Sequence, residues 1–324
     1  MSGFILQRLL QAIVIMAVMS VIVFAGVYAI GNPMELLIPP EATQDVRERT
    51  IQRFGLDRPL VEQYFLFVKN LLQGDLGRSY IYNEPVLKLI GSRLPATIEL
   101  VVTAIVGAVL LGVPLGIYAG YRPESPVSRA IMSLSILGFS VPTFWVGLIL
   151  ILTFAVQLGW LPASGRGDTV EVFGVGWSFL TLDGWSHLAL PATNLALFTF
   201  AMMVRLARAG TREVMLTDTV KFARAAGISE RVILTRHVLK LISIPIVTVF
   251  GLELATTMAF AVVTETIFAW PGVGKLIIDS INNLDRPVMV AYLILTAGAF
   301  VTINLIVDIV YALLDPRLRR GGTR

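Results

Sequence analysis

The sequence contains no cysteine, which excludes disulfide bonds and Cys-ligated metal centres. It has only two histidines, His187 and His237, and it lacks an HExxH pair, an EF-hand loop and a Gly-x-Ser-x-Gly elbow. The Gly-rich stretch 271–275 differs from a nucleotide-binding P-loop, because Ala269 occupies the first Gly position and Leu276 the Ser/Thr position. We therefore expect no catalytic or metal site, and any ATP that the protein uses is expected to bind elsewhere.

Charged residues are also scarce, at 15% of the 324 residues, whereas soluble domains average about 25%. A helix needs roughly 20 apolar residues to cross about 30 Å of hydrocarbon. Five charge-free runs reach that length, at residues 9–34, 100–121, 130–165, 184–204 and 287–307. A sixth apolar segment, 241–270, is interrupted by Glu253 and Glu265. The pattern predicts an all-α, polytopic membrane protein with six transmembrane helices.

The first run lies near the N-terminus, so a cleaved signal peptide is an alternative interpretation. The run covers about 20 residues, which is longer than the 7–15 of a signal h-region. We expect an uncleaved first helix within residues 1–30. In the loop 31–96, capping and turn residues predict three short helices, which begin near Thr43, Pro59 and Pro85.

Basic residues are distributed unevenly between the two sides of the predicted membrane protein. Arg8, the loop 121–129, the segment 205–240 and the tail hold 15 basic residues. The opposite side holds 11, of which eight lie in the long loop 31–96. Long loops cross the membrane largely regardless of charge, so the short loops determine the orientation. The short loops hold 15 basic residues on one side and 3 on the other. Both termini and the segment 205–240 are therefore expected in the cytoplasm.

The segment 208–240 predicts two short helices around a tight turn. Residues 208–226 favour a helix that Gly227 ends in the left-handed conformation. Ser229 is a good N-cap and Glu230 suits a first turn, so a second helix can run to about Leu241. A basic, alanine-rich helix pair fits a groove on a partner protein. Two simpler interpretations are that the basic residues only set topology or only contact anionic lipid.

Several stretches resemble one transporter family. Residues 217–248, TDTVKFARAAGISERVILTRHVLKLISIPIVT, are similar to the EAA loop of ABC importer permeases of the peptide/nickel group. FGLDRPLVEQY, GDLGRS, RLPATIEL, ETIFAWPGVGKL and DIVYALLDPRLR also resemble the B-type permease of that group. Thr219, Phe222 and Ala226 depart from the pattern, where Tyr, Thr and Lys are common.

The resemblance implies a type I ABC importer permease fold in a bacterial inner membrane. It implies an N-terminal helix at 1–30, an extracytoplasmic helical region at 31–96, a core domain at 97–314 and a cytoplasmic tail at 315–324. Within the core, the loop 208–240 would couple to an ATPase. The residues assigned to that coupling are Asp218, Lys221, Ala223, Arg224, Ala225, Gly227, Ser229 and Glu230.

The resemblance also implies partners and a division of labour. A second, homologous permease subunit would complete the pathway, two ATPase subunits would bind ATP and Mg, and an external solute-binding protein would deliver the cargo. The chain itself would be a transport subunit without a cofactor and without enzymatic activity. Peptides are the expected cargo, with nickel chelates, glutathione and sugars as alternatives.

Polar residues inside the apolar segments are costly and usually face inward. Glu253 and Glu265 are candidate pathway residues, because an acidic group could meet a cation or the amino end of a peptide. Glu265 could instead cap the turn after its helix. Asn304 and Asp308 lie one turn apart, and we interpret them as structural contacts to a neighbouring helix.

Two other classes of function stay open. A self-contained secondary transporter would show inverted repeats with paired broken helices, and no clear repeat is visible. A membrane anchor without transport would leave Glu253, Glu265 and the turn at Gly227 unexplained.

Overall fold

The computed structural model describes residues 2–30, 43–53 and 57–314. The chain divides into two compact units, of which the first comprises residues 1–95 and 271–302 and the second comprises residues 96–270 and 303–324. In the described part of the chain, five helices are long and apolar enough to span a membrane. A bent helix pair adds a sixth span if it is counted as one, which agrees with the six predicted spans.

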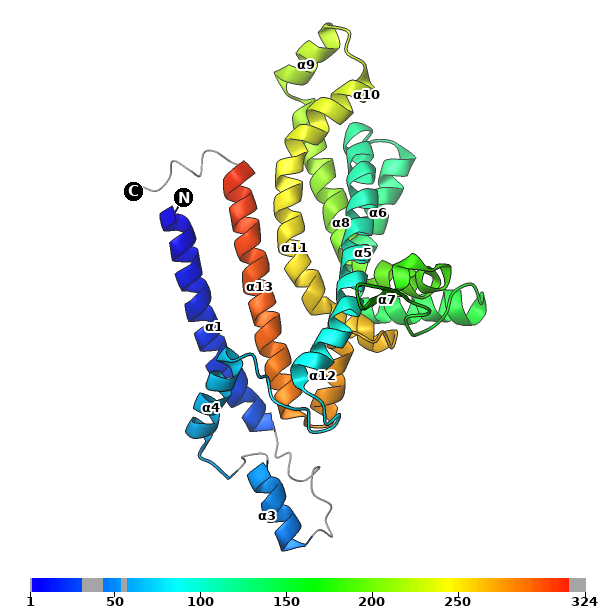
Figure 1. Ribbon diagram of the computed structural model, residues 1–324. Helices are drawn as coiled ribbons and strands as arrows, with labels where there is room; N and C mark the ends of the chain where they lie inside the picture. The colour runs from blue at the N-terminus through cyan, green and yellow to red at the C-terminus, as the bar shows by residue number, and fades with distance from the viewer. Residues whose placement is uncertain (1, 31–42, 54–56, 315–324) are drawn as a thin grey trace. The chain divides into compact units, whose positions relative to one another are not determined.

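The first unit consists of helices that come from both ends of the chain (Figure 1). Its complete helices are α1 (Ser2–Ile30), α3 (Gln44–Arg53), α4 (Leu60–Leu72) and α12 (Val273–Asn282). It also contains the start of α5 (Val86–Tyr121) and most of α13 (Arg286–Leu314).

Helix α4 confirms the prediction of a short helix that begins near Pro59. Pro59 is its N-cap, and Gly74 follows it with a φ of 79°. Its side chains pack on α1, since the Tyr64 and Ser20 hydroxyls lie 2.9 Å apart and the Tyr64 ring centroid lies 5.4 Å from that of Phe24. Part of the apolar face of α4 is therefore covered by a helix of the same unit.

The carboxylate of Asp285 organises the loop between α4 and α5. It is fully buried and accepts hydrogen bonds from the Ser79 hydroxyl and from the N–H groups of Tyr80 and Ile81, the latter two at 3.0 and 3.4 Å. The loop is thereby fixed to the turn between α12 and α13.

The predicted short helix at Pro85 does not exist as a separate element. Val86 begins α5, which continues without a break to Tyr121 over 36 residues. The turn residues Asn83 and Pro85 mark a helix start correctly, but no residue between Val86 and Tyr121 stops that helix before it enters the apolar run.

The second unit contains the remaining elements. Its helices are α6 (Pro126–Ser140), α7 (Thr143–Leu150), the π-helical segment η1 (Ile151–Gln157), the short 3-10 helix η2 (Ser178–Leu180), α8 (Leu182–Met215), α9 (Asp218–Ala225), α10 (Glu230–Val232), the π-helical segment η3 (Ile233–Val238) and α11 (Leu239–Ile267). Strands β1 (Val170–Val172) and β2 (Val175–Trp177) form an antiparallel hairpin. Helices α8 and α11 lie side by side, with α9 and α10 beyond their ends (Figure 1).

Three glycines allow α5 to approach α8 closely. A Cβ added at Gly116 would lie 2.5 Å from the carbonyl oxygen of Val204 and 2.7 Å from the Cβ of Ala207. Gly112 and Gly120, one turn away on either side, face α8 in the same way. Small residues at this spacing are typical of close helix packing in membranes.

The third span is bent, as the position of Pro142 indicates. Helix α6 ends at Ser140, and α7 begins at Thr143 with Pro142 as its N-cap, so that the two axes differ by 112°. Proline lacks an N–H and disfavours a helical residue before it. The bend is much larger than the kink that a proline usually causes within a helix.

Two predicted helix boundaries near the basic segment are wrong. The helix expected at 208–226 is broken at Leu216 and Thr217, between α8 and α9. The helix expected to end near Leu241 runs without interruption from Glu230 to Ile267, with Pro245 inside it. A proline is tolerated within a membrane helix where local adjustments satisfy the freed carbonyl group.

The close packing of α5 on α8 gives a prediction with a matched control. Gly116→Ala should lower the free energy of unfolding by about 1–3 kcal/mol, because the added methyl group meets rigid backbone. Gly107→Ala lies on the same helix with no atom within 4 Å of the added Cβ, so its higher helix propensity should leave stability equal or raise it by up to about 1 kcal/mol. Thermal unfolding of the purified chain in detergent measures both changes. Equal shifts for the two variants would contradict the packing.

Candidate functional site

The basic segment 216–240, which we call the elbow, contains the sharp turn that the sequence predicts. Gly227 has a φ of 79°, and the N–H groups of Gly227 and Ile228 donate to the carbonyl oxygens of Arg224 and Ala223, each at 3.0 Å. These two bonds form a Schellman motif, which ends α9 in a fixed geometry. Ser229 follows at the N-cap position of α10, although its hydroxyl makes no capping hydrogen bond.

One side of the elbow is buried against other residues of the second unit, and its other side is exposed. Val220 and Ala223 on α9 are buried in a cluster with Ile233, Val238 and other apolar side chains of the second unit. Ala223 is therefore a core residue, whereas Ala225, Ala226 and Gly227 are exposed. The exposed surface also carries Lys221, Phe222 and Arg224, and the Phe222 residue is 76% exposed.

One ion pair joins α9 to α10 across the turn of the elbow, and a second lies within α9. The Arg224 Nε donates to Glu230 Oε1 at 2.7 Å, and Lys221 Nζ donates to Asp218 Oδ1 at 2.9 Å. The charged residues between Arg231 and Lys240 place Glu230 outside the hydrocarbon. Its hydrogen bond with Arg224 lowers the pKa of the Glu230 carboxyl and raises the pKa of the Arg224 guanidinium. Both groups are largely exposed, so this pair stabilises the fold only slightly.

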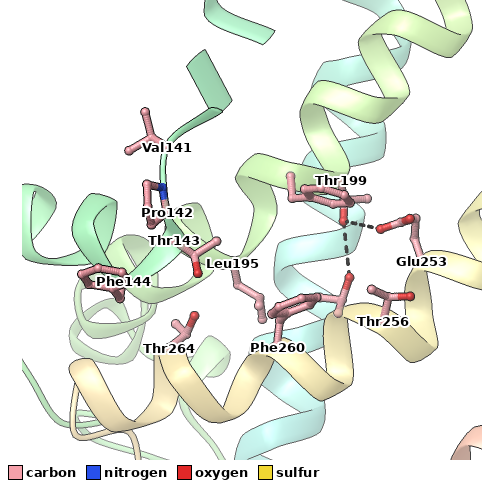
Figure 2. Close-up of a pocket in the computed structure, with 12 residues that line it drawn as sticks. Val141, Pro142, Thr143, Phe144, Leu195, Thr199, Glu253, Thr256, Phe260 and Thr264 are labelled. Carbon is pink, nitrogen blue, oxygen red and sulfur yellow. Dashed lines mark hydrogen bonds between the residues drawn. The ribbon is translucent and has the colours of Figure 1, made fainter. Parts of the chain in front are cut away.

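Glu253 lies on α11 and lines a pocket in the second unit (Figure 2). The pocket has a volume of about 290 Å³. It is formed by the bend between α6 and α7 together with α8 and α11, through Val141, Pro142, Thr143, Phe144, Leu195, Phe198, Thr199, Glu253, Thr256, Thr257, Phe260 and Thr264. The Thr199 hydroxyl lies 3.4 Å from Glu253 Oε2 and 3.3 Å from the Thr257 hydroxyl.

Glu265 lies three turns further along α11 in a different environment. It is fully buried and accepts a hydrogen bond of 2.5 Å from the Thr97 hydroxyl on α5. Its backbone carbonyl oxygen accepts from the N–H of Trp270 at 2.8 Å, which closes the end of the helix. The indole N–H of Trp270 donates to the carbonyl oxygen of Ala96 at 2.9 Å. Glu265 thus joins α11 to α5 and is not among the residues that line the pocket.

A buried ion pair that the sequence did not predict fixes the loop between η1 and α8. Arg166 donates to Glu99 Oε2 through Nε at 3.0 Å and through Nη2 at 2.6 Å. The Phe179 N–H donates to the other Glu99 oxygen at 2.6 Å, and Arg166 also donates to the carbonyl oxygen of Gly176. No sequence spacing links Arg166 with Glu99, which is 67 residues away.

The remaining polar residues of the spans are less informative. Asn304 is partly buried within α13, and the side chain of Asp308 and the tail 315–324 lie outside the part of the chain that the structure describes. The His187 ring lies with Nδ1 2.9 Å from the carbonyl oxygen of Asp183, one turn earlier on the same helix.

Comparisons with known proteins cover both parts of the chain. Residues 112–320 match the family model described as the binding-protein-dependent transport system inner membrane component. Residues 1–101 match the N-terminal model of the membrane component of such systems.

Full-length relatives and a solved structure agree with this match. The chain is 36% identical over 320 residues to the glutathione transport system permease protein GsiC of Escherichia coli O6:H1 and 37% identical to the oligopeptide transport system permease protein AppB of Bacillus subtilis. Each alignment covers 98% of this chain and 99% of the relative. A structure of the MetNI methionine ABC transporter shares the fold, with a TM-score of 0.56, 15% identity, and coverage of 71% of this chain and 97% of that chain. The chain therefore belongs to the family of inner membrane components of binding-protein-dependent transport systems, and it is a multi-pass permease subunit of an ABC importer rather than an enzyme.

Proposed function

We propose that this chain forms one half of the translocation pathway of an ATP-driven importer for peptides or related small solutes. Family membership supports the transport role, and the geometry of the elbow is the observation that supports ATP-driven coupling. The core of the permease is proposed to comprise residues 97–314, in which the second to sixth spans lie. The relatives that transport glutathione and oligopeptides support a cargo with a peptide-like backbone.

The elbow is proposed to dock into a groove on an ATPase subunit. A docking element that transmits force must be rigid, and the Schellman turn and the buried side chains of Val220 and Ala223 provide that rigidity. It must also present a defined surface, and the exposed residues Lys221, Phe222 and Arg224 would form that surface. The ATP and Mg would be bound by two ATPase subunits beneath this chain and a second, homologous permease.

The distribution of basic residues supports the orientation. The short loops that contain the elbow and both termini hold 15 basic residues, against three in the short loops of the other side. We therefore propose that the elbow and both termini face the cytoplasm. A solute-binding protein would then deliver cargo to the opposite side of the membrane.

The pocket at Glu253 is proposed to lie on the pathway. It is the kind of site that cargo could contact, because it is open to a ligand and combines a carboxylate with hydroxyl groups and aromatic rings. Glu265 also remains a proposed pathway residue, but its hydrogen bond with Thr97 supports a structural contribution at the end of α11.

Reconstitution separates this proposal from a self-contained secondary transporter. We expect that the purified chain alone, in liposomes with an ion gradient, takes up neither dipeptides nor glutathione. Uptake should require the second permease, the ATPase subunits, the binding protein and ATP. Ion-driven uptake by the chain alone would contradict the proposal.

The turn at Gly227 provides a test of coupling. Gly227→Val should abolish most ATP-dependent uptake in membrane vesicles, because a β-branched residue at a φ of 79° costs about 1–3 kcal/mol of strain. The expected loss does not come from a steric clash, since no atom lies within 4 Å of a Cβ added at Gly227. Gly227→Asn should retain uptake, because Asn tolerates this conformation.

Ala226→Val is the matched control for this variant. Ala226 is the neighbouring exposed residue and has an ordinary helical φ of −76°, so its substitution should change uptake little. Membrane fractions must contain equal amounts of all the variants. Normal uptake by Gly227→Val at equal insertion would show that the elbow geometry is not needed for coupling.

The exposed side chain of Phe222 provides a second test. If Phe222 enters an ATPase groove, Phe222→Ser should weaken docking by about 1.5–3 kcal/mol, the value for burying a Phe side chain. The thermal stability of the isolated chain should not change, because the residue is 76% exposed. Leu182→Ser, at the other end of α8 and 91% exposed, is the control. Co-purification with the ATPase measures docking, and an equal loss for both variants would contradict a specific contact.

A further inference from the structure

Glu253 is unusual among the buried carboxylates of the second unit, because its bonding capacity is largely unused. Its residue is 7% exposed, and the hydrogen bond from Thr199 is long, at 3.4 Å. Glu99, by contrast, accepts three hydrogen bonds, of which two come from Arg166. Within the described residues, no Lys, Arg or His forms an ion pair with Glu253. A buried carboxylate that has no cation beside it is unfavourable unless it takes up a proton. A cationic group that enters the pocket would stabilise the charged form of Glu253 through an ion pair.

The walls of the pocket fit one type of cation. A primary ammonium group has three N–H donors, and the carboxylate and the hydroxyls of Thr199, Thr256 and Thr257 offer oxygen acceptors beside it. Phe198 and Phe260 also line the pocket, and an ammonium group is attracted to the face of an aromatic ring. A divalent metal would instead require several carboxylate or carbonyl ligands, and the described residues contain no group of three or more acidic or His side chains.

The size of the pocket limits what enters it. Pockets for small ligands commonly have volumes of about 300–1,000 Å³, and this one, at about 290 Å³, lies at the lower end. It can hold one residue-sized part of a cargo molecule rather than a whole oligopeptide.

We propose that the pocket beside the bend at Pro142 binds the ammonium-bearing end of the cargo, with Glu253 as the residue that determines specificity for positive over negative charge. This inference rests on the proposed function, in which the pocket lies on the cargo pathway. It adds that the permease itself selects cargo by charge and does not leave selection entirely to the binding protein. An N-acylated or anionic terminus would lose the ion pair with Glu253 and leave that carboxylate unpaired.

The absence of cysteine from the sequence allows a test that does not depend on transport. Thr256→Cys places one thiol in the pocket, on α11 and three residues from Glu253. In the full transporter in proteoliposomes, a trimethylammonium methanethiosulfonate should modify this thiol faster than a sulfonate methanethiosulfonate. The rate ratio should fall about tenfold when Glu253→Gln is added, which corresponds to about 1.4 kcal/mol.

The ratio of the two modification rates separates the effect of the Glu253 charge from the other effects of the substitution. A change in thiol pKa or in pocket shape alters both rates, whereas a change in electrostatic attraction alters their ratio. Glu213→Gln removes an exposed acidic charge of α8 that does not line the pocket, so this control should leave the ratio unchanged. An unchanged ratio in Glu253→Gln, or a thiol that reacts with neither reagent, would overturn the proposal.

Protection from labelling tests the ligand class directly. Alaninamide, which carries a free ammonium group, should slow the modification of Thr256→Cys, and N-acetylalaninamide at the same concentration should not. The protection should disappear in the double variant with Glu253→Gln. Equal protection by both compounds would contradict ammonium recognition even if ATP-dependent uptake is intact, and a loss of uptake in the elbow variants would not affect this result.

Discussion

The structure depends on the requirement that polar groups within hydrocarbon find partners inside the protein, because no water is present there to satisfy them. Glu265 meets this requirement through Thr97, and Glu99 through Arg166. Both contacts join segments that are far apart in the sequence, and both lie near the end of a span. Glu253 is the exception, with a long hydrogen bond and a pocket beside it, and this difference is the reason for proposing that it contacts the cargo.

The elbow and the pocket are connected by one continuous helix. Residues Glu230–Ile267 form an uninterrupted helix that begins at the elbow and carries Glu253 in its middle. The 23 residues from Glu230 to Glu253 correspond to about 35 Å at 1.5 Å per residue. Since packed helices move largely as rigid bodies, a displacement of the elbow by an ATPase would move the wall of the pocket. In the proposed coupling, this helix would connect ATP hydrolysis at the elbow with cargo release at the pocket.

Local signals in the sequence predicted the local features of the fold. The charge-free runs predicted the spans, and Gly227 predicted the left-handed turn that ends α9.

Signals that depend on the surroundings were less reliable. The second helix of the basic segment was expected to end near Leu241, but it continues through Pro245, which a membrane helix tolerates. Pro142 marks the place of the break between α6 and α7, but no local signal in the sequence gives the 112° angle between them. The ion pair of Arg166 with Glu99 arises only from tertiary structure. The β1–β2 hairpin was also missed, although Phe173 and Gly174, with φ of 53° and 76°, form a tight turn between its strands.

The central claim is that the elbow faces the compartment in which ATP is hydrolysed. The most direct test labels a single cysteine at the exposed position Ala226 with a membrane-impermeant thiol reagent. The account predicts labelling in inside-out membrane vesicles and none in intact, energised cells whose outer membrane has been made permeable. Labelling in the intact cells would place the elbow on the extracytoplasmic side and would contradict the coupling mechanism.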